Sequence, residues 1–247
     1  SRLCSNAKSG QILVSESVYL EVGDYGIFDF QRLDSIFVKG KENEVSIFSL
    51  VKCNCSPKVI AAFDLVLELL LKLAPELYYH SISHTLDVFR TSRNIALSEG
   101  ISDSDLELIQ VAALFHDTGF LEKSVGHEEI SCKLAQDNLG SLGFNKEQIT
   151  SVCEMIRATK IPQQPTNLLG KILADADLDY LGRTDFQEIA SLLYKELSHQ
   201  NNLLLEAEWD QIQIKFLRNH HYFTKTSIKL RTEQKNKHLQ SLIEKYL

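Results

Sequence analysis

Cysteine motifs and uncharged apolar segments are both missing from this chain of 247 residues. The five cysteines are odd in number, and the Cys53-Asn54-Cys55 spacing fits neither a zinc knuckle nor a CxxC redox motif. A chain of this length also does not need disulfide bonds to stabilise its core. We therefore expect reduced thiols and a cytoplasmic protein.

No segment is apolar enough to suggest a membrane span. The most apolar stretch, residues 59–74, contains Asp64, Glu68 and Lys72, each costly at the centre of a bilayer. It is typical of a buried amphipathic helix. The net charge of −7 provides no basic surface for duplex nucleic acid or for an anionic membrane. A small anionic substrate stays compatible, because a bound metal can outweigh the overall charge locally.

The hydrophobic pattern changes near residue 58. Residues 1–51 contain short strand patterns at 11–14, 28–33 and 45–50 and one or two helical turns at 15–20. After a linker at 52–57, the period becomes helical, and no strand pattern or internal repeat follows. We predict helices at 57–74, 77–99, 103–116, 126–139, 145–159, 167–182, 184–199, 203–221 and 225–245. The fold class is therefore mainly α, with a small α/β block in front.

Histidine and aspartate residues recur at three places within the predicted helices: residues 79–84, His116-Asp117, and residues 175–177. Buried imidazole and carboxylate groups are costly without a compensating cation. This ligand chemistry suits a divalent metal such as Mn, Fe, Zn or Mg. Such a metal lowers the pKa of bound water and supplies hydroxide near neutral pH. The set predicts a metal-dependent hydrolase.

The first two places have different local settings. His80 and His84 are four residues apart, which on a regular helix puts both on one face. A hydrogen-bonded pair in the core, or an exposed pair, fits the same spacing. Asp117 follows an apolar helix at its C-terminal end, where the helix dipole disfavours a carboxylate. This unfavourable position strengthens the case for a cation beside Asp117.

The third place offers two carboxylates, Asp175 and Asp177. On a regular helix through residues 169–181, Asp177 shares a row with leucines, whereas Asp175 belongs to a polar row. The two rows are Leu169, Leu173, Asp177 and Leu181, and Lys171, Asp175 and Asp179. We expect Asp177 to face the core as the metal ligand, and Asp175 to be solvated or to lie behind the ligands.

In this order, the motifs resemble the HD-domain superfamily of metal-dependent phosphohydrolases over residues 58–247. The residues that carry the resemblance are Tyr79-His80 with His84, Ala113 to Gly119, Gly126 to Glu129 and Ile172 to Leu178. The resemblance implies an all-helical HD-domain bundle. It implies the metal ligands His84, His116, Asp117 and Asp177. It also implies that His80 is the acid that protonates the leaving group. With His80, the metal ligand Asp117 is expected to be catalytic.

The resemblance extends to a second metal only in part. His127 matches an additional histidine of members that hold two metals. Where those members carry a further histidine pair, this chain has Ala158-Thr159-Lys160. We therefore expect one divalent metal, with Asp175, His127 and Lys160 behind the ligands or against the substrate phosphate. An ordinary exposed lysine also fits Lys160.

Residues 1–51 resemble the C-terminal part of a class III adenylate/guanylate cyclase catalytic domain. The resemblance rests on Ser1 to Ser15, Ile36 to Lys41 and Val45 to Phe48. It implies that Arg2 stabilises charge on a transferring phosphate and that Lys39 lies near a triphosphate. The metal-binding aspartates of that family would precede Ser1, so we expect no cyclase activity. The block is either the end of a longer cyclase–HD protein or a packing and linking element.

These features together predict a metal-dependent phosphatase or phosphodiesterase that acts on a nucleotide or another small phosphoester. The cyclase resemblance favours cyclic-nucleotide signalling, with a cyclic nucleotide among the substrates. The alternative is a non-catalytic module that senses a nucleotide or a metal for a cyclase domain. We expect no nucleic-acid partner and no membrane span. Because class III cyclase domains act as dimers, the resemblance also allows a homodimer.

Overall fold

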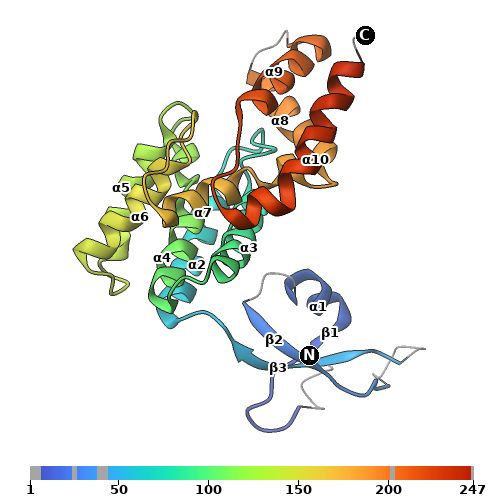
Figure 1. Cartoon of the computed structure of the whole chain (residues 1–247). Coiled ribbons are helices and arrows are strands. Elements are labelled where there is room, and N and C mark those ends of the chain that lie inside the picture. The colour runs from blue at the N-terminus through green and yellow to red at the C-terminus, as the bar shows by residue number, and fades with distance from the viewer. Residues whose placement is uncertain (1–6, 24–26, 38–43, 201–203, 246–247) are drawn as a thin grey trace. The chain divides into compact units, whose positions relative to one another are not determined.

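The computed structural model describes residues 7–23, 27–37, 44–200 and 204–245 of the chain. The chain divides into two compact units, residues 1–57 and 58–247 (Figure 1), and each is described by itself. Arg2 and Lys39, which the cyclase resemblance singles out, lie outside the described residues. Within the described part of the chain, no helix has both the length and the apolar character needed to cross a membrane.

The N-terminal unit is a small antiparallel sheet with one short helix. Its elements are β1 (Leu13–Ser15), α1 (Glu16–Val22), β2 (Phe28–Arg32) and β3 (Ile47–Cys53), in the strand order β1-β3-β2. The Val18 amide donates a hydrogen bond to the Ser15 hydroxyl, which caps the first turn of α1. The Tyr19 ring stacks on Phe48 with 4.0 Å between their centroids. This aromatic pair packs α1 against the sheet.

Every regular element in the described residues of the larger unit is a helix, which confirms the predicted fold class. Its helices are α2 (Pro57–Leu70), α3 (Ile82–Glu99), α4 (Asp103–Phe115), α5 (His127–Leu139), α6 (Lys146–Ala158), α7 (Leu168–Asp177), α8 (Phe186–Gln200), α9 (Glu206–Asn219) and α10 (Lys225–Glu244). Two 3₁₀ turns, η3 (Thr118–Leu121) and η4 (Asp179–Gly182), follow α4 and α7. Figure 1 shows α5 and α6 on one side of α3, α4 and α7, with α8 to α10 on the other.

Local capping chemistry sets several helix ends. Gly100 ends α3 in the left-handed conformation, with φ of 72°, which costs glycine little because it has no Cβ. The Ser102 hydroxyl then accepts a hydrogen bond from the Asp105 amide and begins α4. At the start of α6, Asn145 and Gln148 form a reciprocal capping box. These ends agree with the sequence because each depends on only a few neighbouring residues.

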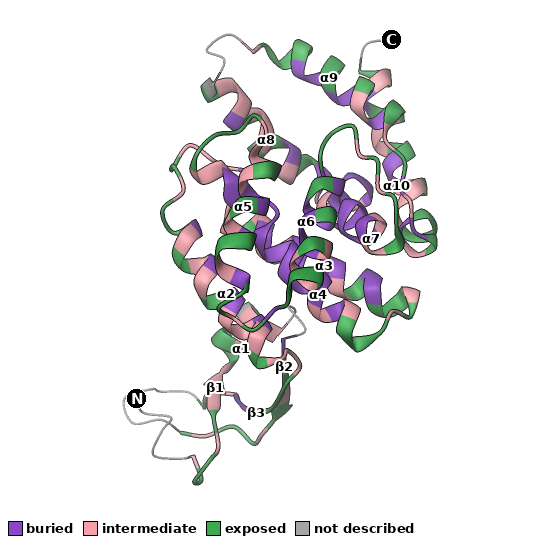
Figure 2. Ribbon diagram, turned by 90° about the vertical axis from the view of Figure 1, so that its left-hand side faces the viewer, coloured by how far each residue is buried: buried purple, intermediate pink, exposed green. Residues whose placement is uncertain are grey.

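The core of this unit is centred on α4. Every residue from Leu108 to Phe115 is buried, and α3, α6 and α7 pack against this helix. Figure 2 shows the buried residues concentrated where these helices meet. Since α4 is enclosed on all sides, its C-terminal end places His116 and Asp117 in the interior, and both are buried.

Several predicted helices are shorter than expected, and two of these differences affect the candidate site. The predicted helix 77–99 begins only at Ile82, because the Glu196 carboxylate accepts hydrogen bonds from the Tyr79 and His80 amides. His80 therefore precedes the helix, and the expectation that it shares a helical face with His84 is wrong. The predicted helix 167–182 ends at Asp177, and Leu178 leaves the helical conformation with φ of −109° and ψ of 18°.

Two members of the polar row, Asp175 and Asp179, lie inside the protein. Asp175 has an exposed fraction of 0%, and its carboxylate accepts hydrogen bonds from the Phe223 amide, the Thr224 amide and the Thr224 hydroxyl. Asp179 is also buried and pairs with Arg231 at 2.7 Å. Both carboxylates attach the C-terminal helix α10 to the core. The expectation of a solvated Asp175 is therefore wrong, since partners distant in sequence cover it.

Replacing Asp175 with alanine is expected to destabilise the helical unit by about 3–5 kcal/mol, because three buried donors lose a charged acceptor. The free energy of unfolding in urea measures this loss. Asp137→Ala, at an exposed position of α5, is the control and should leave the unfolding curve unchanged. Equal curves for Asp175→Ala and the wild type would show that the carboxylate does not anchor α10.

Candidate metal centre

Four side chains from three separate segments converge at one point of the helical unit. His84 lies in the first turn of α3, His116 and Asp117 follow the last turn of α4, and Asp177 ends α7. The ligand atoms of His84, His116 and Asp177 all lie within 4.8 Å of one another and could hold a metal ion. The structure thus brings together the four residues that the sequence singles out as ligands.

The distances between these atoms fit a shared cation. The Nε2 atoms of His84 and His116 are 3.4 Å apart, and Oδ1 of Asp177 lies 3.1 Å and 3.5 Å from them. Oδ2 of Asp117 lies 3.4 Å and 3.3 Å from the same two nitrogens. Neighbouring ligands of a metal bound at ordinary lengths are about 3.0–3.4 Å apart in octahedral or tetrahedral arrangements. His84, His116 and Asp177 therefore have a spacing that is compatible with one divalent metal, and Asp117 lies beside the two imidazoles.

The hydrogen bonds at this point also call for a cation. His116 donates its Nδ1 hydrogen to the Ala113 carbonyl at 2.7 Å, which leaves a lone pair on Nε2. That lone pair faces Oδ2 of Asp117, which is buried and has no hydrogen-bond partner in the described structure. When Nε2 carries no proton, the two acceptors face each other in the interior, which is unfavourable unless a proton or another positive charge lies between them. A metal ion would supply that charge.

The electrostatic field of the centre is strongly negative. Burial alone would lower the pKa of His116, but the carboxylates of Asp117 and Asp177 raise it well above its ordinary value. Burial would raise the pKa of Asp177, but hydrogen bonds and charge from His116 and His84 lower it to about 2. The site therefore stabilises a proton on His116 between two ionised carboxylates. The same field would bind a divalent cation in place of that proton.

His80 stands beside this centre with a fixed orientation. Its Nδ1 donates to Oε1 of Glu196 at 2.5 Å, and its ring stacks on Phe120 with 3.9 Å between centroids. Burial would raise the pKa of Glu196, but its hydrogen bonds from His80 and Tyr79 lower it below its ordinary value. Glu196 is thus ionised and directs Nε2 of His80 away from α8. A histidine held in this way is suited to transfer a proton.

Sequence reasoning did not identify Glu196. Its position carries a signal, because it lies three residues after Leu193 and seven after Ile189, on the apolar face of α8. A carboxylate on such a face needs a buried partner, and only 2% of Glu196 is exposed. This position does not predict which residue pairs with Glu196, since His80 is 116 residues earlier in the chain.

The remaining candidates lie around the centre. His127 begins α5, donates to the Ser124 carbonyl through Nδ1 and places Nε2 3.3 Å from Oδ1 of Asp117. Gly119 permits this approach, because a Cβ there would collide with the His127 carbonyl. Lys160 is exposed and lines the cavity in front of the centre. Asp175 does not line that cavity, so its place is behind α7.

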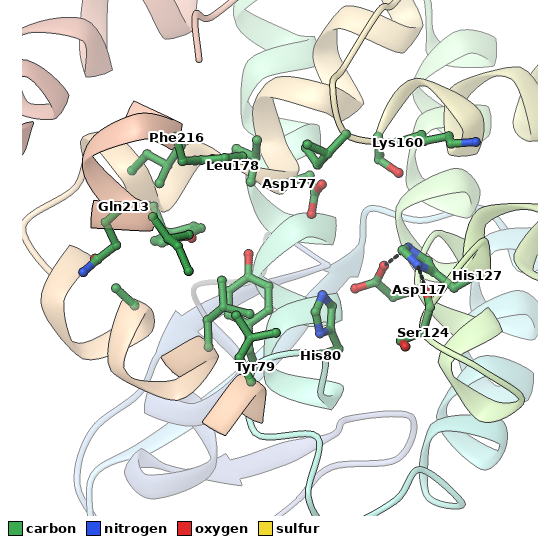
Figure 3. Close-up of a pocket in the computed structure, with 18 of the residues that line it drawn as sticks. Tyr79, His80, Asp117, Ser124, His127, Lys160, Asp177, Leu178, Gln213 and Phe216 are labelled. Atoms are coloured by element: carbon green, nitrogen blue, oxygen red, sulfur yellow. Dashed lines mark hydrogen bonds and ion pairs between the residues drawn. The ribbon is translucent and has the colours of Figure 1, made fainter. Parts of the chain in front are cut away.

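A cavity of about 560 Å³ opens onto the centre and includes His80, Asp117 and Asp177 in its lining. Figure 3 shows Asp117, His127 and Lys160 on one side of it and Gln213 and Phe216 on the other. Its volume is in the range of small-molecule sites. A substrate in this cavity would therefore lie against both the histidine–aspartate cluster and His80.

Comparison with known proteins identifies part of this unit. The HD domain family matches residues 81–179. The chain contains an HD domain. All four candidate ligands lie inside the matched segment, whereas His80 directly precedes it and Glu196 lies beyond it. The resemblance of residues 1–51 to a nucleotide cyclase stays a prediction.

Solved structures share the fold of the HD domain unit. A predicted HD superfamily hydrolase from an uncultured Thermotogales bacterium has a TM-score of 0.52 and 24% identity, covering 77% of this chain and 91% of its own. A protein from Lactobacillus plantarum has a TM-score of 0.55 and 16% identity, covering 77% and 98%. No curated protein matches the chain. At these identities the likeness shows the fold alone.

The pair of Glu196 and His80 leads to a prediction about pH. Because the pKa of Glu196 is lower in the folded protein than its ordinary value of 4.5, ionised Glu196 contributes stability above about pH 4.5. That contribution is lost as the pH falls through the folded pKa. Glu196→Gln should therefore lower the free energy of unfolding by about 1–3 kcal/mol near pH 7, and the difference from wild type should shrink toward about pH 3.

Urea unfolding of both proteins in a chelator, at a series of pH values, measures this difference. The chelator keeps metal release from contributing to the pH dependence. Glu188→Gln, at an exposed position of the same helix, should follow the wild-type curve. A difference between Glu196→Gln and wild type that stays constant with pH would show that the charge of Glu196 does not stabilise the fold.

Proposed function

We propose that this protein is a metal-dependent phosphohydrolase with one divalent metal held by His84, His116, Asp117 and Asp177. The observation that carries the proposal is the buried Asp117 Oδ2, which has no hydrogen-bond partner in the described structure and lies 3.3 Å from Nε2 of His116. The HD domain match supports it, because HD domains bind divalent metals. Mn, Fe, Zn and Mg all suit this combination of imidazole and carboxylate ligands.

In the proposed reaction, the chain's own residues orient the substrate and move one proton. A bound divalent metal would supply positive charge for a phosphoryl group and lower the pKa of water. His80, protonated on both nitrogens, would donate its Nε2 proton to the departing oxygen while Glu196 retains the Nδ1 hydrogen bond. Phe120 holds the plane of the His80 ring by stacking. The two carboxylate oxygens of Asp117 face different partners. Oδ2 faces His84 and His116, and Oδ1 faces His127.

The proposed substrate is a small phosphoester, and a nucleotide or cyclic nucleotide belongs in the first set to be tested. The cavity has room for a molecule of that size. Lys160 and His127 line its polar side, where they could contact a phosphate. The cyclic-nucleotide guess rests on the resemblance of residues 1–51 to a cyclase. Both phosphatase and phosphodiesterase chemistry are compatible with this arrangement.

A non-catalytic sensor of a nucleotide or a metal is the alternative. A sensor needs ligands for its target but no oriented proton donor. The hydrogen bond between His80 and the ionised Glu196 gives this site such a donor beside the cavity. This pair favours hydrolysis over sensing. Ligand binding that raises the melting temperature without any turnover would instead support the sensor.

The first prediction concerns the ligands. Asp177→Asn should remove most bound metal and reduce turnover of phosphoesters by about 100-fold or more, because a charged ligand is lost. Metal content per chain, after purification without chelators, and phosphate release are measured on the same sample. Asp137→Asn at an exposed position of α5 is the control and should retain both. Full turnover in a metal-free Asp177→Asn protein would overturn the proposal.

The second prediction concerns the proton donor. His80→Asn should reduce turnover of alkyl phosphates by about 100-fold to 10,000-fold, because an alkoxide needs a proton to leave. Turnover of nitrophenyl phosphate should fall by less than about tenfold, since its leaving group is stable as an anion. The ratio of the two losses is the measurement, and metal content should stay unchanged. Equal losses for both substrates would assign His80 a structural role.

A further inference from the structure

The cavity in front of the metal centre has two chemically different halves. The polar half contains His80, Asp117, His127, Lys160 and Asp177. The other half is built by η4 and by the helices α8 and α9, which lie after the matched HD domain segment. Its side chains are apolar and include Leu181, Leu193, Leu197, Trp209, Ile212 and Phe216. Figure 3 shows Phe216 and Gln213 across the cavity from Asp117 and His127.

The polar half has positive charge for only one phosphate group. Among the described residues that line the cavity, Lys160 is the one lysine or arginine, whereas Asp117, Glu128 and Asp177 are acidic. The neighbouring Arg157 does not line it, because its guanidinium makes a bidentate pair with Glu129. A triphosphate chain would bring several negative charges without matching cations. The charges therefore favour a substrate with a single phosphate.

The apolar half has little to offer a sugar. Gln213 provides an amide in the lining of the apolar half, and its Nε2 already donates a hydrogen bond to Asp210 at 3.3 Å. Oε1 of Gln213 is buried without a hydrogen-bond partner in the described structure and can accept one hydrogen bond. The rings of Tyr79 and Tyr180 lie close together, with 5.6 Å between their centroids. Several hydroxyls of a bound sugar would lose their hydrogen bonds to water here, which is unfavourable.

A second cavity adjoins the apolar half, and its lining combines apolar side chains with the polar Gln163, Lys215, Asn219, His220 and His221. It has a volume of about 430 Å³ and shares Ile161, Leu178, Ile212 and Phe216 with the first. Ile212 stands at the junction and is 46% exposed although it is a large apolar side chain. A long apolar chain that starts at the metal centre could pass Ile212 and continue into the second cavity. Burial of that chain would contribute binding energy in proportion to its apolar area.

We propose that the preferred substrate is a phosphate monoester with an uncharged apolar body, an alkyl or aryl group, which α8 and α9 bind. This proposal rests on the proposed hydrolytic function and names the class of its substrate. Water would add its oxygen to phosphorus while the bond from phosphorus to the ester oxygen breaks. That oxygen would take its proton from His80 and leave as an alcohol, and the proton lost by the water would restore His80.

The single tryptophan of the chain provides a test that does not need turnover. Trp209 lines the apolar half and is buried, so a chain bound there should change its fluorescence. We would titrate the protein with methyl-, butyl- and octylphosphonate. These compounds have a carbon–phosphorus bond in place of the ester oxygen and therefore are not hydrolysed. The affinity should rise by about fourfold for each methylene that becomes buried. Ribose 5-phosphate and ATP are the polar comparisons and should bind no better than methylphosphonate.

A matched pair of variants tests the location. Ile212→Lys places a charge at the junction of the two cavities, whereas Ile228→Lys makes the same change on α10, in neither cavity. Both side chains are similarly exposed, at 46% and 48%, so both variants should fold. Ile212→Lys should abolish the gain from butyl to octyl in phosphonate affinity and in kcat/KM of the phosphate esters. Ile228→Lys should retain this gain and the wild-type turnover of methyl phosphate.

The outcomes separate this proposal from the function on which it rests. Metal-dependent turnover with no preference for longer apolar esters, or with a preference for ATP or ribose 5-phosphate, would overturn the apolar substrate and leave the hydrolase. A chain-length dependence of phosphonate binding without turnover of any ester would support the apolar site and overturn the hydrolase. An unchanged affinity from methyl- to octylphosphonate, with no change in Trp209 fluorescence, would overturn the apolar site directly.

Discussion

The structure of the helical unit depends on how two carboxylates and two imidazoles are accommodated in its interior. His84, His116, Asp117 and Asp177 are held by three segments that pack on one another, so the side chains cannot separate to reach water. Asp117 Oδ2 and Nε2 of His116 then face each other at 3.3 Å, with no donor between them unless Nε2 is protonated. Such a cluster is unfavourable by itself and becomes favourable around a cation. Metal binding and packing of α3, α4 and α7 are therefore expected to stabilise each other.

Glu196 joins the metal centre to the part of the protein that shapes the cavity. It lies on α8, whose neighbouring residues Leu193 and Leu197 line the apolar half, and its carboxylate holds the backbone and the ring of His80. A substrate body that packs on α8 would thus contact the same helix that orients His80, the proposed proton donor. The matched HD domain segment contains the four proposed ligands, while the helices after it shape the cavity and hold His80.

Agreement between sequence and structure is best where the controlling interaction is local. Gly100 and Ser102 mark a helix end and a helix start, since a left-handed glycine and a hydroxyl cap act within a few residues. The apolar row through Leu173 correctly placed Asp177 toward the interior. The same reasoning failed for Asp175, because the segment that covers it, at Phe223 and Thr224, is nearly fifty residues away. Helical periodicity cannot tell a polar side chain in water from one bound by a distant element.

Composition and periodicity were therefore sufficient for the helical class and the order of the helices, and the resemblance to the HD-domain superfamily named the four histidines and aspartates expected to bind a metal. The roles of those four residues stay predictions, although the fold brings them into contact. Tertiary structure alone decided that His80 leaves the helix, that Glu196 is its partner and that an apolar cavity adjoins the centre. Each of these depends on α8 or α9 meeting residues more than a hundred positions away. Contacts of that kind arise from packing, which leaves no local pattern in the chain.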